Sequence, residues 1–215
     1  MMLIPAEQLR KTFQVEAKFY YAQVNEERFL MRQQARIFRK GISQSTTDAV
    51  FVMINPGGCL PGESIGNIEI AEAKFISAKP DPTQYQLMNL MERKGWNVIT
   101  LINLSDICEG NMKSFISREK EFRKANVAHS LFQQGNTKEL KEVLASADHL
   151  IFAWGASDIA KKLACQFGLF HDGQPTDSYL HAKALVHVEN KYPRHPKPAT
   201  IANRIIWLKE MEPLL

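Results

Sequence analysis

Four short apolar runs constrain the fold of this chain more than any other feature of its sequence. Each has strand length, carries β-branched or aromatic residues, and ends at glycine, asparagine or another polar residue; they span residues 49–54, 96–102, 149–154 and 183–189. Continuous apolar runs of this length are typical of strands that are buried on both faces. Helical patterns follow most of them, at residues 82–94, 115–146, 157–168 and 199–211. We therefore expect an α/β protein, a three-layer α/β/α sandwich around a central, mainly parallel four-stranded sheet.

The rest of the chain fits one domain. Residues 13–21 and 28–38 alternate between apolar and polar residues or are amphipathic, which indicates a hairpin or a strand followed by a helix. We expect residues 1–45 to form an N-terminal segment that packs on the sheet. The chain has 215 residues, of which 45% are hydrophobic and 23% charged. This composition excludes disorder and favours a single domain over residues 1–215.

Composition also limits the partners. No apolar run approaches the ~20 residues of a membrane span, and the first residues lack the layout of a signal peptide, so we expect a cytoplasmic protein. Cys59, Cys108 and Cys165 are too few and too widely spaced for a disulfide framework, and the six histidines show no metal-ligand spacing. We therefore expect no metal and no cofactor. The net charge of +4 permits binding to nucleic acid without requiring it.

Polar residues follow the predicted strands at the edge where α/β folds bind ligands. Asn55-Pro56-Gly57-Gly58 follows the first strand, where its exposed N–H groups suit an anion or a ligand carbonyl, or form an ordinary turn. Asn103 ends the second strand, and its amide matches the edge of a nucleobase. Asp106 either orients a water molecule or caps a turn.

The third and fourth strands lead to further candidates. Trp154 ends the third strand, and Ser157 is placed to cap the next helix. Arg194, His195 and Lys197 follow the fourth strand, where the histidine suits a developing oxyanion and the cations suit phosphate. The alternative for these three is a solvated basic loop. We interpret Asp81-Pro82-Thr83 as a helix cap followed by a first-turn proline.

Five short motifs, in this order, resemble the bacterial family DUF1643. They are Asn55-Pro56-Gly57, Asp81-Pro82-Thr83, Asn103-Leu104, Ala153-Trp154-Gly155 and His195-Pro196. The resemblance covers roughly residues 28–200.

Some of the same segments are also similar to the uracil-DNA glycosylase superfamily, which has an α/β/α sandwich fold. The resemblance implies a DNA N-glycosylase that flips a base into the strand-end pocket. Asn55 would hold the hydrolytic water with Asp106, Asn103 would read the base, and His195 would stabilise the departing base anion. The other implied contacts are made to the substrate by Pro56, Gly57, Gly58, Trp154 and Ser157, and to DNA phosphates by Arg194, Lys197 and Lys161.

The sequence departs from that superfamily at two points. Asn55 stands where the uracil-specific enzymes have an aspartate, so an alternative is a nucleic-acid or nucleotide-binding module that has lost the strong base; a nucleoside hydrolase is a third hypothesis. Gly57 stands where those enzymes have a bulky tyrosine, so we expect open space beside Gly57 and Gly58. Such a pocket would favour a pyrimidine with a large 5-substituent, as in repair or in defence against modified phage DNA.

Overall fold

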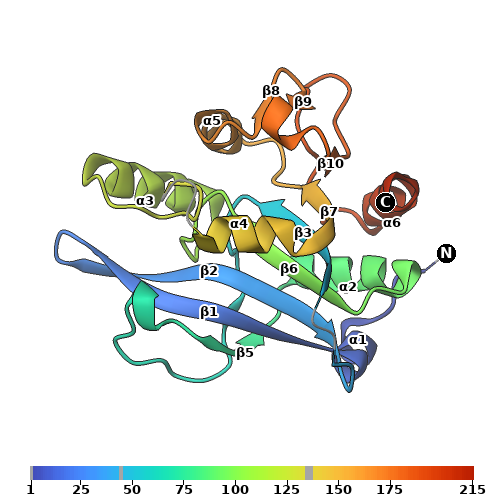
Figure 1. Ribbon diagram of the computed structural model, residues 1–215, viewed down its shortest axis with the longest axis horizontal. Helices are drawn as coiled ribbons and strands as arrows, with labels where there is room; N and C mark the ends of the chain where they lie inside the picture. Colours follow the sequence, from blue (N-terminus) through green and yellow to red (C-terminus); the bar gives the residue numbers. More distant parts are fainter. Residues whose placement is uncertain (1, 44–45, 134–137) are drawn as a thin grey trace.

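The computed structural model describes residues 2–43, 46–133 and 138–215. Its centre is one eight-stranded sheet with the strand order β10-β7-β3-β6-β2-β1-β5-β4 (Figure 1). The four strands expected from the sequence form its parallel half: β3 (Thr47–Met53), β6 (Val98–Asn103), β7 (Ala147–Phe152) and β10 (Lys183–Ala184). The predicted α/β architecture, a central sheet flanked by helices, is confirmed.

The predicted count of four strands was wrong, because an antiparallel half continues the sheet beyond β6. Its strands are β2 (Glu27–Arg39), β1 (Phe13–Val24), β5 (Phe75–Lys79) and β4 (Leu60–Pro61). The β1–β2 hairpin is therefore part of the sheet rather than a segment packed on it. The predicted strand over residues 183–189 shortens to two residues in β10, which lies at the edge of the sheet and pairs with β7 alone.

Helices cover both faces of the sheet. One face packs against α1 (Ala6–Thr12), α2 (Pro82–Lys94) and α6 (Ile201–Met211), and the other against α3 (Met112–Lys124), α4 (Lys138–Ala145) and α5 (Asp158–Gln166). The helix predicted over residues 82–94 is confirmed as α2, with the same bounds. Asp81 caps its start, and Gly95 ends it in the left-handed conformation with φ 67°. The predicted break near residues 135–136 lies outside the described residues.

Smaller elements connect the layers. They are the hairpin of β8 (Phe170–His171) and β9 (Gln174–Pro175) and the 3₁₀ turns η1 (Ile70–Glu72), η2 (Asp177–Tyr179) and η3 (Glu212–Leu214). Cys59, Cys108 and Cys165 are free thiols. Among the described residues, no helix is long and apolar enough to cross a membrane.

The order of the parallel strands determines where a ligand fits. The chain runs from β3 through α2 to β6 on one side of β3, and later returns to β7 on the other side. The direction in which strands are added therefore reverses at β3. Such a switch point opens a crevice beyond the carboxyl ends of the strands, here next to residues 54–58.

Candidate functional site

A pocket of about 460 Å³ lies at this switch point. Its walls come from segments that are far apart in the sequence: Arg32, residues 53–58, residues 81–84, Leu101, Glu109, Gly110, Met112, residues 154–157, and His195 with Lys197. Eight of the predicted site residues line it: Asn55, Pro56, Gly57, Gly58, Trp154, Ser157, His195 and Lys197. Asn103, Asp106, Lys161 and Arg194 do not.

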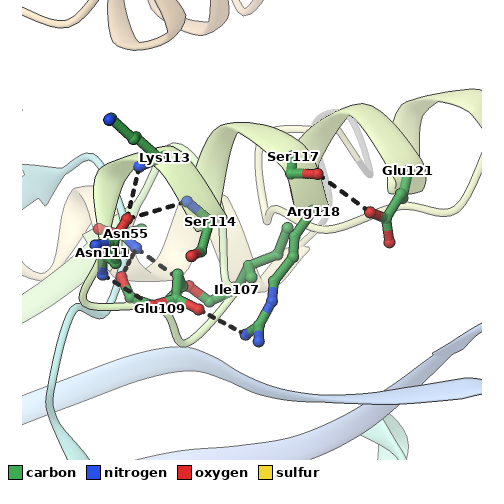
Figure 2. Close-up of polar contacts among 9 residues, drawn as sticks. All are labelled: Asn55, Ile107, Glu109, Asn111, Lys113, Ser114, Ser117, Arg118 and Glu121. Carbon is green, nitrogen blue, oxygen red and sulfur yellow. Dashed lines mark hydrogen bonds and ion pairs between the residues drawn. The ribbon is translucent and has the colours of Figure 1, made fainter.

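Asn55 is held by the loop that precedes α3. Its Nδ2 donates to the carbonyl oxygens of Ile107 at 3.4 Å and Glu109 at 2.6 Å, as Figure 2 shows. Glu109 is itself anchored, since its carboxylate accepts from the backbone N–H of Asn111 and pairs with Arg118 at 2.9 Å. Because both partners of Nδ2 are acceptors, the amide orientation is fixed. The Oδ1 atom has no hydrogen bond within the described residues and is available to a water molecule or a ligand.

Asn103 was predicted to contact a ligand in the pocket, but it does not line the pocket. It is fully buried, and its Oδ1 accepts from a guanidinium N–H of Arg32 at 3.4 Å, so the arginine lies at the pocket wall instead. Ser130 further fixes this strand end by donating its hydroxyl to the Asn103 carbonyl oxygen at 3.1 Å. The predicted direct contact between Asn103 and a bound base is therefore not present in this arrangement.

Asp106 is also away from the pocket. Its side chain is 1% exposed, and Oδ2 accepts from the hydroxyl of Tyr20 at 3.0 Å. Burial raises the pKa of Asp106 well above its ordinary value, because the charged form is poorly solvated there. The prediction that Asp106 holds a catalytic water with Asn55 has no support in this geometry. The carboxyl group lies in the buried core, where it accepts a hydrogen bond from Tyr20.

Asp81 is a pocket residue that sequence reasoning missed. Its Oδ1 accepts from the backbone N–H groups of Thr83 and Gln84, which confirms the predicted cap. Its Oδ2 lies next to Gly57, where a β-carbon would be only 3.0 Å away. The space beside Gly57 is therefore occupied by a carboxylate and is not open as we expected from the two glycines. The sequence signalled the cap, but not the direction of the second oxygen.

His195 lines the same pocket as Asp81, and it is close enough for the carboxylate to act on its charge. Its Nδ1 lies 3.2 Å from the backbone nitrogen of Lys197 and 3.4 Å from the Lys197 carbonyl oxygen, so the backbone of Lys197 holds the ring through Nδ1 in either tautomer. Burial lowers the pKa of His195; the hydrogen bond with the backbone of Lys197 and the Asp81 carboxylate partly offset this effect, and the Lys197 charge adds to it. The ring packs on Gly155, where a β-carbon would be 3.3 Å from Cβ of His195. The site thus holds an imidazole whose neutral form is favoured by burial and whose Nδ1 is engaged by the backbone of Lys197.

The three cations predicted to bind phosphate differ in their positions and in their interactions with other side chains. Lys197 lines the pocket. Arg194 is paired with Glu210 and lies in a neighbouring cavity of about 680 Å³ that shares Gly155 and His195 with the first. Lys161 lies over the ring of Tyr192, with Nζ 5.6 Å from the ring centre. Of these three cations, Lys197 alone lines the pocket that contains Asn55 and Asp81.

Arg32 is the second residue that sequence reasoning missed. It comes from β2, where a bulge pairs Phe19 with Arg32 but the preceding Lys18 with Gln34. A bulge shifts the alternation of a strand by one residue, so Arg32 is buried at 2% exposure in a stretch where every side chain from 31 to 35 is buried. The only sequence signal was a charged residue inside an amphipathic run.

Among the described residues, no group of three His, Cys, Asp or Glu side chains is placed to hold a metal ion. Fold and pocket together define an α/β protein with a polar ligand site at the switch point of its sheet. A family model of proteins of unknown function, DUF1643, matches residues 71–197, and the chain belongs to this family. The matched region contains Asp81, Trp154 and His195, whereas Arg32 and Asn55 precede it. No curated protein and no solved structure matches the chain.

Proposed function

We propose that the pocket binds a nucleobase turned out of a nucleic-acid strand and that the site hydrolyses its N-glycosidic bond. The main support for the proposal is that Asn55, Asp81 and His195, from three separate loops, line one pocket. The volume of about 460 Å³ lies within the ~300–1,000 Å³ of small-molecule sites. The sequence resemblance to uracil-DNA glycosylases points to the same chemistry.

The three groups suit the charges that develop as a glycosidic bond breaks. Positive charge grows on the sugar and negative charge on the departing base. The free Oδ2 of Asp81 would orient the attacking water, take its proton and stabilise the sugar cation, while Oδ1 of Asn55 accepts the second water hydrogen. The Nε2–H of His195 would donate to the base as it leaves with the bonding electrons. Asp81 thereby supplies the carboxylate that position 55 lacks.

A binding module without catalysis is the second candidate, and the contacts of Asn55 favour it. Its amide is tied to two backbone carbonyls and cannot accept a proton from water. If Asp81 only caps α2, the pocket would hold a base without releasing it. The two candidates predict different products from the same substrate.

The direct experiment incubates the protein with single- and double-stranded DNA that carries varied bases, including uracil and 5-substituted pyrimidines. Abasic sites are then revealed by alkaline cleavage, and free bases by chromatography. We expect base release that His195→Ala and Asp81→Asn each lower at least about 100-fold, the range for loss of one catalytic donor or base. The exposed His181→Ala is the matched control and should retain the parent rate.

The outcomes separate the candidates. DNA binding without release of any base would reject the enzyme and favour the binding module. Release from free nucleosides but not from DNA would favour a nucleoside hydrolase. Because the Asp81 carboxylate occupies the space beside Gly57, there is no longer a steric reason to expect a preference for a bulky 5-substituent. The same assay therefore compares uracil with 5-substituted pyrimidines without an expected preference.

A further inference from the structure

Arg32 presents a buried positive charge to the pocket with few partners of its own. Its side chain is among the largest fully buried ones in the described part of the protein. One guanidinium nitrogen donates to the carbonyl oxygen of Pro56 and another to Oδ1 of Asn103, both at the long distance of 3.4 Å. The Nε–H has no hydrogen-bond partner within the described residues. Several of its five N–H donors are therefore unused or weakly used.

No carboxylate in the described residues forms an ion pair with Arg32. Of the pocket acids, Glu109 pairs with Arg118, and Asp81 caps α2 through Oδ1 with its Oδ2 beside Gly57, so neither is paired with Arg32. Asp106 is close enough to interact electrostatically, but its burial favours the protonated, neutral form. A buried charge without a counter-ion costs folding free energy, so such a group is expected to serve a ligand.

The position of the guanidinium defines the chemistry of that ligand. The group is planar and carries donors only, and it recognises planar groups with two neighbouring acceptor atoms through paired hydrogen bonds. Met53 and Leu101, which are apolar and buried, line the same pocket as Arg32. An apolar surround strengthens an interaction with negative charge.

We propose that Arg32 forms a buried subsite for a planar, singly charged anion with two adjacent acceptor atoms, the class to which carboxylates and deprotonated nucleobases belong. The subsite stands on burial and unused donors, and it does not depend on whether the site cleaves a glycosidic bond. In an enzyme that releases a base, the same group would hold the departing base anion. In a binding module it would select an anionic small molecule.

The test compares the parent protein with Arg32→Met by thermal unfolding and titration calorimetry. The probes are barbiturate, a planar pyrimidine that is anionic at neutral pH, benzoate as a carboxylate, and uracil as a neutral pyrimidine. We expect the parent to bind at least one of the two anions, and Arg32→Met to bind it at least ten-fold more weakly, with no comparable change for uracil. Preference between barbiturate and benzoate identifies which kind of anion the subsite accepts.

The unfolding temperature of Arg32→Met shows whether a loss of anion binding comes from a damaged fold or from the missing guanidinium. Because no carboxylate of the described residues forms an ion pair with Arg32, Arg32→Met should fold with an unfolding temperature at least equal to that of the parent without ligand. Arg36→Met is the matched control, since Arg36 lies on the same strand but pairs with Glu16 at 3.7 Å near the surface; it should leave anion binding unchanged. Equal anion binding by the parent and Arg32→Met, or no anion binding by the parent, would overturn the proposal. Anion binding without base release would retain the subsite and reject the glycosylase.

Discussion

Oδ2 of Asp81 lies so close to Gly57 that a β-carbon on Gly57 would be 3.0 Å away. The same carboxylate caps α2 through Oδ1, so one side chain connects the start of a helix to the loop after β3. Gly57 also has a φ of 62°, in the left-handed region that glycine adopts without strain. Glycine is therefore favoured at this position for two separate reasons, its backbone conformation and the nearby carboxylate.

We predict that Gly57→Ala damages the site more than it damages the fold. The left-handed backbone costs alanine about 1–2 kcal/mol, and the methyl group must also displace Asp81. Gly95→Ala is the control, because Gly95 has a φ of 67° but no atom within 4 Å of its β-carbon position. Both variants should lose similar stability in urea unfolding, and only Gly57→Ala should lose ligand binding or base release. Equal activity of the two variants would contradict a role for Asp81 in the pocket.

Stability should fall in mild acid because of His129. Burial lowers the pKa of His129 to about 4. Between pH 6.5 and pH 4 the unfolded chain binds a proton there that the folded protein does not, so the free energy of unfolding decreases as pH falls through this range. The loss attributable to His129 is about 3 kcal/mol for 2.5 pH units, and it levels off below pH 4.

Urea unfolding at several pH values measures this slope. His129→Gln should flatten it, while the exposed His181→Gln should leave it as in the parent. The test is the difference between the parent and His129→Gln, since Asp106 contributes equally to both; parallel curves for these two proteins between pH 6.5 and pH 4.5 would show that His129 titrates normally.

Asp106 should have the opposite pH dependence. Its raised pKa means that the folded protein keeps a proton which the unfolded chain releases above about pH 4, so stability attributable to Asp106 decreases as pH rises. Asp106→Asn keeps an oxygen that accepts from Tyr20 and removes the titration. We expect this variant to be more stable than the parent at pH 8, with the difference shrinking toward pH 4. It should also retain base release, whereas a catalytic Asp106 would give an inactive variant.

The parallel half of the sheet could be predicted because its strands are buried on both faces and are therefore continuous apolar runs. The helix at 82–94 was predictable from Asp81, the following proline and Gly95. In the antiparallel half, the β1–β2 hairpin was one of the two alternatives that the pattern of residues 13–38 allowed, and the structure confirms it. Its place within the sheet was not predictable, because β1 and β2 mix apolar and polar side chains, and β4 is too short to leave a pattern. Nothing local in residues 13–39 indicates that β2 pairs with β6.

The site divides in the same way. Asn55, Trp154 and His195 were found because each lies in a loop beyond a strand at the same edge of the sheet. Arg32 was missed because its position depends on a bulge and on a contact with Asn103, 71 residues away. Asn103 was predicted at the strand end, but burial by a partner from the other half of the sheet cannot be read from its own neighbours.

Lys197 should dominate the salt dependence of nucleic-acid binding. It lines the pocket and has no ion pair within the described residues, whereas Arg194 is already paired with Glu210. A cation releases counterions from DNA when it binds a phosphate, and a cation that is already paired must first give up its partner to do so. We expect Lys197→Gln to weaken duplex binding and to reduce the slope of log affinity against log salt by about 0.9, the value for one phosphate contact.

The pairing of Arg194 supplies matched variants for this test. Arg194→Gln should change the slope less than Lys197→Gln, and Glu210→Gln should strengthen binding because it frees the guanidinium. Fluorescence anisotropy with a labelled duplex over a range of salt concentrations measures all three slopes. Affinity that does not depend on salt in the parent protein would point to a small-molecule ligand, and equal slopes for Lys197→Gln and Arg194→Gln would show that the Glu210 pair opens when DNA binds.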